Sequence, residues 1–406
     1  MERAGKKRAL IIGGSMSGLL AALLLRGAGW QVAVYERVEG ELAGRGAGIV
    51  AQPDLIATLR RLALDPTDLG VAITTRSILH RDGSVMAQFH CPQVLTAWER
   101  VYRLLRDALP APLYQRGCAF VSFEQSATSV VARFDDGSTV EGDLLVGADG
   151  LRSTVRQQCL PALKPAYAGY VAWRALIPEA VFPASIHREL FEYMTFCLPP
   201  GEQCLGYPVA GPENDLRVAH RRYNVVWYRP AAEATELRRL LTDEGGTTHV
   251  ISIPPPLIPG EAIREMRAAA ERLLAPQLRT VVGLIDEPIL QPIYDLESPQ
   301  MAFGRVAIIG DAAFVARPHV AAGVAKAADD AVALAHSLTL DDVEPALKRF
   351  EALRQPVGRR IIERARHLGA YLQATQSMQE RARSQRHSIP EAVLAETALL
   401  DFLQQH

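Results

Sequence analysis

At the start of the chain, apolar residues follow first a strand pattern and then a helical one. The apolar run over 9–12 predicts a buried strand, and residues 17–28 carry apolar positions at the spacing of a helix. Residues 31–35 return to an apolar strand pattern after a short glycine-containing connection. A strand, a glycine turn, a helix and a second strand in this order are typical of a βαβ unit, so we predict that the chain opens with an α/β domain.

The middle of the chain has a different residue pattern. From about 168 to 228, short runs rich in Tyr, Trp, Phe and Val are separated by Pro and Gly, which predicts an antiparallel sheet. Buried strands are predicted at 144–147 and 306–309, on either side of this sheet in the sequence, and helical patterns dominate from about 322. We therefore predict an α/β (α+β two-domain) fold. The predicted division is a first domain in two parts (1–165 and 291–375), an inserted sheet domain (166–290) and a helical C-terminal segment (376–406).

Composition excludes several classes of partner. The formal net charge of −1 offers no long-range attraction to nucleic acid or to a membrane surface, and we predict neither as a partner. The five cysteines are odd in number and show no C-x-x-C spacing, which argues against a disulfide framework or a zinc site and favours the cytoplasm. Histidines show no H-x-x-x-H pairing, so we predict no metal site.

The glycine turn after the first strand almost matches the dinucleotide fingerprint G-x-G-x-x-G. Gly13 and Gly18 hold the outer positions, whereas Ser15 stands at the second glycine. The following helix offers its free N–H groups and positive dipole end to a phosphate. Glu36 ends the second strand about twenty residues on, where a carboxylate binds ribose hydroxyls. We predict a Rossmann-like site for NAD or FAD, with a ligand-free glycine turn as the alternative; its candidate residues are Gly13, Gly14, Ser15, Met16, Ser17, Gly18, Glu36 and Arg37.

Two later stretches carry a resemblance to a known family. GADGLRSTVR at 147–156 and GRVAIIGDAA at 304–313 each follow or contain a predicted buried strand. Together with the first fingerprint they resemble the three signatures of the FAD-dependent aromatic hydroxylases of the para-hydroxybenzoate hydroxylase type. The resemblance implies that Asp149 has a positioning role where flavin and nicotinamide approach each other, and that Asp311 bonds the ribityl chain of FAD.

Finer similarities point to one branch of that family, the 2,6-dihydroxypyridine 3-hydroxylases, which act on hydroxylated pyridines. The stretches that resemble this branch are QPDL (52–55), AYAGYVAWRA (166–175), YPVAG (207–211) and RPHVAAGVAKAADDA (317–331). In the stretch RGAGIV, Arg45 stands where the family places a flavin-contacting basic residue, and Gly48 is a further candidate contact.

The chain departs from the family pattern at three places. Phe314 stands where histidine usually follows GDAA, and residues 321–323 read Ala-Ala-Gly in place of the common G-Q-G. Trp98 holds the place of an arginine that usually lies over the FAD phosphates, and either Arg100 or Arg103 could replace it.

The resemblance implies a flavoprotein monooxygenase that uses FAD, NADH or NADPH as a transient co-substrate, and O2. In that chemistry a flavin C4a-hydroperoxide transfers oxygen to an electron-rich ring, here a small aromatic or heteroaromatic substrate. The sequence leaves the ring, the position hydroxylated and the choice between NADH and NADPH open. A homodimer formed through the helical C-terminus is an expectation.

The substrate side of the site rests on a few candidates. Pro318 precedes a helix predicted to start near Ala322, Gly323 and Val324, whose N–H groups would face the negative charge of reduced flavin. His319, as a base of near-neutral pKa, would accept the proton of a ring hydroxyl, with a structural histidine as the alternative. Further polar candidates for the pocket are Tyr207 and His220.

Rival functions are less consistent with the sequence. A flavin-dependent halogenase would show W-x-W-x-I-P, but the corresponding residues 173–178 lack the second tryptophan. An NAD-dependent dehydrogenase would lack the motifs at Asp149 and Asp311. A hydroxylase of another phenolic or heteroaromatic substrate, or an FAD-binding protein without hydroxylase activity, remain the alternatives.

Overall fold

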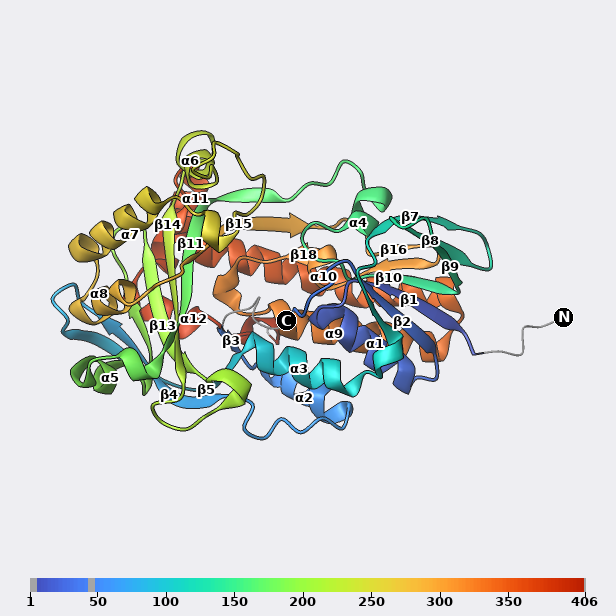
Figure 1. Ribbon diagram of the computed structural model, residues 1–406, viewed down its shortest axis with the longest axis horizontal. Helices are drawn as coiled ribbons and strands as arrows, with labels where there is room; N and C mark the ends of the chain where they lie inside the picture. The colour runs from blue at the N-terminus through green and yellow to red at the C-terminus, as the bar shows by residue number, and fades with distance from the viewer. Residues whose placement is uncertain (1–5, 43–47, 405–406) are drawn as a thin grey trace.

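The computed structural model describes residues 6–42 and 48–404, and two large sheets divide it into two halves (Figure 1). One half contains a six-stranded sheet and the other a nine-stranded sheet. Helices α9 (Gly323–Leu340) and α10 (Val343–Gly369) lie in the middle of the view, where the two halves meet. The predicted α/β fold with two sheets is therefore present.

The six-stranded sheet is the core of the first half. Its strands, in spatial order, are β16 (Ala302–Phe303), β17 (Val306–Ile308), β10 (Leu144–Gly147), β1 (Arg8–Ile12), β2 (Gln31–Glu36) and β6 (Tyr114–Arg116). All neighbours pair in parallel except β16 with β17. Strands covered on both faces carry continuous apolar runs, and the residues of β10 are buried throughout. Helix α1 (Met16–Gly27) connects β1 to β2, which confirms the predicted βαβ unit.

The nine-stranded sheet forms the second half. Its strands, in spatial order, are β18 (Phe314–Val315), β15 (Ile289–Glu297), β11 (Ala166–Pro178), β14 (Arg222–Pro230), β13 (Gln203–Val209), β12 (Tyr193–Cys197), β4 (Val71–Leu79), β5 (Val85–Ala97) and β3 (Gly48–Val50). The predicted sheet at 168–228 supplies only its centre, since β3, β4 and β5 come from residues 48–97. The division expected at residue 165 therefore does not separate the two sheets.

The two faces of the nine-stranded sheet pack against different cores. Alternate residues of β14 belong to different apolar clusters, with Trp227 in one and Tyr228 in the other. Helices α7 (Gly260–Leu273) and α8 (Pro276–Gly283) cover the Trp227 face. The opposite face, with Tyr228, packs against residues of α12 (Pro390–Glu396) and of the 370–372 turn. This split follows the alternation of the sequence.

The remaining elements complete the two halves. A small sheet, β7 (Phe120–Gln125), β8 (Val130–Phe134) and β9 (Thr139–Gly142), contains the hairpin predicted at 136–137. The further α-helices are α2 (Pro53–Arg61), α3 (Trp98–Ala108), α4 (Thr154–Cys159), α5 (Ala184–Leu190), α6 (Arg238–Leu240) and α11 (Met378–His387). Within the described part of the chain, no helix has both the length and the apolar content that a membrane crossing requires.

Candidate FAD and substrate site

The three sequence motifs meet at one edge of the six-stranded sheet. They follow the carboxyl ends of β1, β10 and β17, which are parallel neighbours, so residues 13–18, 148–156 and 310–313 lie together. Ligands of open α/β sheets bind at this edge. Arg156 joins two of the motifs, because its Nη1 donates to the carbonyl of Ala312 at 2.9 Å.

The glycines of the first motif are required by close backbone approach. Gly13 has φ +105°, and a Cβ there would lie 2.4 Å from the carbonyl oxygen of Ala148. A Cβ on Gly18 would lie 1.9 Å from the carbonyl oxygen of Gly13, so the third glycine allows α1 to pack against the turn. A Cβ on Gly14 would meet the hydroxyl of Tyr114 at 2.2 Å. The turn therefore presents bare backbone, as a pyrophosphate needs.

Glu36 and Tyr114 hold this turn from the neighbouring strands. The Glu36 carboxylate is buried and accepts hydrogen bonds from the N–H of Gly14 at 2.8 Å and of Val38 at 2.9 Å. The Tyr114 hydroxyl donates to the carbonyl of Gly14 at 3.0 Å. Arg37, by contrast, is exposed. Tyr114 was not predicted from the sequence, because it reaches the turn through the distant pairing of β6 with β2.

The other first-motif candidates lie at the start of α1. Ser15 is the N-cap residue of the helix, although its side chain makes no capping hydrogen bond. Met16 is buried in the core, whereas Ser17 lies against the third motif, since a Cβ on Gly310 would meet its hydroxyl at 2.1 Å. The Ser15 and Ser17 hydroxyls thus stand beside the N–H groups that an α-helix leaves unpaired at its start.

Asp149 fixes the backbone of the second motif. Its carboxylate accepts hydrogen bonds from the Ser153 hydroxyl at 2.5 Å, the Thr154 N–H at 2.7 Å and the Val155 N–H at 3.2 Å. These donors lie at the start of α4, where helix N–H groups lack partners. Burial raises the pKa of Asp149, while these hydrogen bonds lower it. Asp149 therefore shapes the loop that faces Gly13.

Asp311 lies beside the start of α9 with a partly exposed side chain. Its side chain is 53% exposed, yet burial by the atoms around it raises its pKa. The preceding Gly310 has φ +59°, and its N–H donates to the Asp330 carboxylate of α9 at 3.0 Å. This bond ties the third motif to the helix that starts at Gly323.

The start of α9 is strained. Helix α9 begins at Gly323, as predicted, with Ala322 buried and Val324 in its first turn. Ala321 has φ +47° and ψ +33°, a left-handed conformation that costs a residue with a Cβ about 1–2 kcal/mol. Non-glycine residues persist in this left-handed region where the surrounding structure holds them in place, which is common at functional sites.

Phe314, which stands where the family usually has histidine, packs against Gly358 of α10, so its ring serves packing.

His319 lies in a buried aromatic cluster. It sits in a short turn formed by residues 318–320, its Nε2 is 2.8 Å from the Tyr170 hydroxyl, and its ring centroid is 4.5 Å from that of Tyr228. Burial, and then the positive charge of Arg317, lowers its pKa to about 3. The predicted near-neutral pKa is therefore wrong, because desolvation disfavours the imidazolium. His319 is a neutral hydrogen-bonding group.

The low pKa of His319 predicts a stability effect. Between about pH 3 and the ordinary histidine value of about 6.5, the unfolded chain binds a proton at this residue and the folded chain does not. Stability should therefore rise with pH through this window, by up to ~1.4 kcal/mol per pH unit. We expect His319→Asn to flatten this acid limb in urea unfolding curves. An unchanged acid slope in the variant would contradict the assignment.

Tyr207 and Gly48 lie side by side in the nine-stranded sheet, and Tyr207 belongs to the same apolar cluster as Tyr228. The N–H of Gly48 donates to Asn224 Oδ1 at 2.9 Å, and a Cβ on Gly48 would lie 2.6 Å from the Tyr207 ring. Tyr207 is buried, and burial raises its pKa to about 12. His220 is elsewhere: its side chain is 54% exposed and lies 3.4 Å from Asp215, in the connection between β13 and β14. The structure therefore places His220 on an exposed connection, and its contribution to the pocket stays a prediction.

The structure bears on which residue replaces the arginine that usually lies over the FAD phosphates. Trp98 begins α3 and stacks on Tyr102 with ring centroids 5.0 Å apart. Arg103 is paired with Glu99 at 2.7 Å on an exposed face. Arg100 keeps a buried Nε with no hydrogen-bond partner among the described residues, which favours it as the replacement. Arg45 lies outside the described residues.

The C-terminal segment contacts the turn that carries His319. The Ala398 N–H donates to the carbonyl of His319 at 2.7 Å, and its own carbonyl accepts from the side chains of Gln52 and Gln93, each at 3.1 Å. Arg76 is fully buried and donates to two further carbonyls, those of residues 394 and 397. Sequence patterns did not indicate this role, because every bond joins parts of the chain that are far apart.

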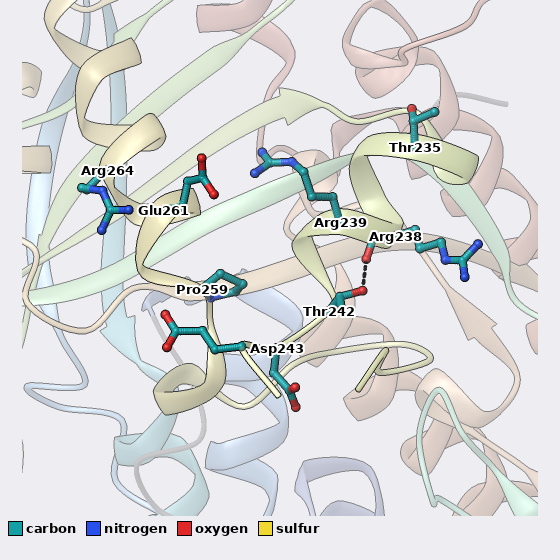
Figure 2. A pocket seen from close by; sticks show the side chains of 9 residues that line it. Thr235, Arg238, Arg239, Thr242, Asp243, Pro259, Glu261 and Arg264 are labelled. Atoms are coloured by element: carbon teal, nitrogen blue, oxygen red, sulfur yellow. Dashed lines mark hydrogen bonds between the residues drawn. The ribbon is translucent and has the colours of Figure 1, made fainter. Parts of the chain in front are cut away.

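A pocket of ≈ 650 Å³ lies elsewhere, beside α6 and α7 (Figure 2). It contains none of the motif residues, and Arg239 in its wall is already paired with Glu236 and Glu265. Its residues are Thr235, Arg238, Arg239, Thr242, Asp243, Glu244, Pro259, Glu261 and Arg264. This pocket is therefore not the site that the motifs build.

The residues at the sheet edge fit FAD. The bare glycine turn suits a pyrophosphate, the strand-end Glu36 suits a ribose, and the accessible Asp311 suits a polyol chain. A family of proteins described as FAD binding domain-like matches residues 167–295.

Known proteins resemble the chain over almost its whole length. The 2,6-dihydroxypyridine 3-monooxygenase of Paenarthrobacter nicotinovorans is 32% identical over 372 residues, which cover 90% of this chain and 91% of that protein. The solved structure of 2,6-dihydroxypyridine-3-hydroxylase from Arthrobacter nicotinovorans matches with a TM-score of 0.86 and 31% identity, covering 92% and 94%. HpxO of Klebsiella pneumoniae, in complex with FAD and uric acid, matches with a TM-score of 0.74 and 25% identity, covering 94% and 92%. The chain therefore belongs to the FAD-dependent aromatic hydroxylases.

Proposed function

We propose that this enzyme hydroxylates a hydroxylated pyridine or a similar heteroaromatic ring, with NADH or NADPH as electron donor and O2 as oxygen donor. The observation that carries the proposal is that the chain runs from the third FAD motif into the 318–320 turn, where His319 contacts the buried tyrosines Tyr170 and Tyr228. The similarity to a 2,6-dihydroxypyridine 3-monooxygenase over 90% of the chain supports this substrate class.

Each group of residues has a proposed task. Bound FAD supplies the oxygen-transfer chemistry, and the protein binds and orients it and excludes water. The first-motif turn with Glu36 would hold the nucleotide, and Asp311 the ribityl chain. The N–H groups of α9 would face the negative charge of the reduced ring.

The substrate ring would lie near the face of the nine-stranded sheet that carries Tyr228. Tyr170, Tyr207 and Tyr228 are buried there, and burial raises the pKa of each, so all three stay neutral hydrogen-bonding groups at physiological pH. His319, being neutral as well, would accept or donate a hydrogen bond to a ring hydroxyl. A neutral polar wall of this kind suits a small ring with hydroxyl substituents better than a charged substrate.

The proposal is tested with the purified holoenzyme. Hydroxypyridines, simple phenols and uric acid are added in turn while NADH or NADPH oxidation and the bleaching of the flavin absorbance are followed. We expect hydroxypyridines to accelerate flavin reduction and to yield a product with one additional oxygen. Flavin reduction that is equally fast with and without every ring would reject the proposal.

A second substrate class has its own support. HpxO, whose complex contains uric acid, matches 94% of this chain. Faster turnover of uric acid than of any hydroxypyridine would assign the enzyme to that class.

Two further expectations stay proposals. All five cysteines are free thiols, which supports our proposal of a reducing cytoplasm. Assembly as a homodimer also stays a prediction.

A further inference from the structure

Lys326 is a buried cation for which the fold provides little compensation. It is the fourth residue of α9, its side chain is 1% exposed, and its Nζ has no hydrogen-bond partner among the described residues. Its nearest charged atoms are Asp311 Oδ1 at 3.9 Å and Asp330 Oδ2 at 4.0 Å. Both distances exceed those of a charge-assisted hydrogen bond.

This position is unfavourable for a lysine on electrostatic grounds. An ammonium group removed from water without hydrogen bonds is destabilising, and so is a positive charge in the first turn of a helix, where the dipole is also positive. Such a local conflict is expected at functional sites, where a ligand completes the interactions.

Asp330 cannot be the main reason for this cation. Its two carboxylate oxygens already accept hydrogen bonds, one from Arg354 Nε at 2.8 Å and one from the N–H of Gly310 at 3.0 Å. Arg354 also supplies the positive charge that neutralises it. The remaining partner of Lys326 is therefore Asp311, whose side chain is 53% exposed and can contact a ligand.

We propose that Lys326 is a positioning residue for FAD, whose ammonium group holds the Asp311 carboxylate in place to receive the ribityl hydroxyls. This inference rests on the proposed contact between Asp311 and FAD. The groups that surround Asp311 support it: burial, the largest cause, raises the pKa of that carboxyl, Asp330 raises it further, and Lys326 lowers it. Lys326 is thus what opposes protonation of the carboxyl.

The test separates cofactor affinity from stability. For Lys326→Met we expect the dissociation constant of FAD, measured by fluorescence titration of the apoprotein, to rise about tenfold, since hydrogen bonds to charged groups are among the stronger ones. The melting temperature of the same apoprotein should stay unchanged or rise, because an apolar side chain replaces a poorly compensated buried charge. A purely structural lysine would instead lower the melting temperature. Lys326→Arg should recover most of the affinity, because it restores the charge.

Two controls fix the origin of the effect. Lys348→Met removes a charge from an exposed position of α10 and should leave FAD affinity unchanged. Asp311→Asn should weaken FAD binding, and adding Lys326→Met to it should cause little further loss, because the lysine acts through the carboxylate. In Lys326→Met alone, FAD affinity should fall at a higher pH than in the wild type as the solution is acidified.

The outcomes are distinguishable. FAD affinity of Lys326→Met within twofold of the wild type, or losses that add fully in the double variant, would overturn the inference while leaving the hydroxylase proposal intact. An Asp311→Asn variant that binds FAD normally would overturn both the Asp311 contact and the role of Lys326. Failure of the wild-type holoenzyme to respond to any ring would concern the proposed substrate alone.

Discussion

Gly13→Ala is expected to lose most of its FAD affinity and to be destabilised by ~3 kcal/mol. Gly13 has φ +105°, and the added Cβ would lie 2.4 Å from the carbonyl oxygen of Ala148. That oxygen belongs to rigid backbone next to β10, so β1 and β10 must separate where the first two motifs meet. FAD titration and urea unfolding of the purified variant measure the two effects.

Gly27→Ala is the matched control in the same βαβ unit. Gly27 is the last residue of α1, and a Cβ there would meet no atom within 4 Å. Alanine also restricts the unfolded chain, so this variant should be as stable as the wild type or slightly more stable. Equal FAD affinity of the Gly13 and Gly27 variants would show that close packing at Gly13 is not needed for the site.

Arg317→Leu is expected to destabilise the protein by ~3 kcal/mol. The Arg317 side chain is 5% exposed and that of Asp295 is 7% exposed, and Arg317 Nη2 donates to Asp295 Oδ2 at 2.9 Å. Removal of the arginine leaves a buried carboxylate, and among residues 6–42 and 48–404 the more distant Arg366, at 3.4 Å, is the one cation left beside it. Because Arg317 directly precedes the 318–320 turn, the loss should also disturb His319. Urea unfolding measures the change.

Two comparisons show whether the buried charge is the cause. Combining Arg317→Leu with Asp295→Asn should recover part of the stability, because it removes the unpaired charge. Arg133→Leu breaks the exposed pair with Glu124, at 3.4 Å, and should change stability by less than ~1 kcal/mol. Similar losses in both arginine variants would exclude the buried pair as a major source of stability.

Local sequence pattern predicted the elements that carry the motifs. Apolar runs indicated β1, β2 and β10, and the glycine spacing indicated the turn at Gly13. Alternation along β14 also accounts for the separation of Trp227 from Tyr228, because a pleated strand places successive side chains on opposite faces. These features depend on neighbours in the sequence.

Features that depend on distant segments were missed. Strand β4 pairs in parallel with β12, although more than a hundred residues separate them, and no local pattern records that pairing. The low pKa of His319 does not follow from the local sequence, because its burial comes from Tyr170, Tyr228 and the C-terminal segment. Lys326 lies within a predicted helix, but its burial beside Asp311 depends on the packing of the 310–312 turn against α9, which no local pattern records.

The most direct test of the central claim is to follow one oxygen atom. The holoenzyme is incubated with a hydroxypyridine, NADH or NADPH, and isotopically labelled dioxygen, and the products are analysed by mass spectrometry alongside an assay for hydrogen peroxide. We predict that the ring product carries one labelled oxygen atom in an amount that matches the nicotinamide oxidised. Nicotinamide oxidation that ends entirely in hydrogen peroxide, with every ring unlabelled, would contradict the assignment as a hydroxypyridine hydroxylase.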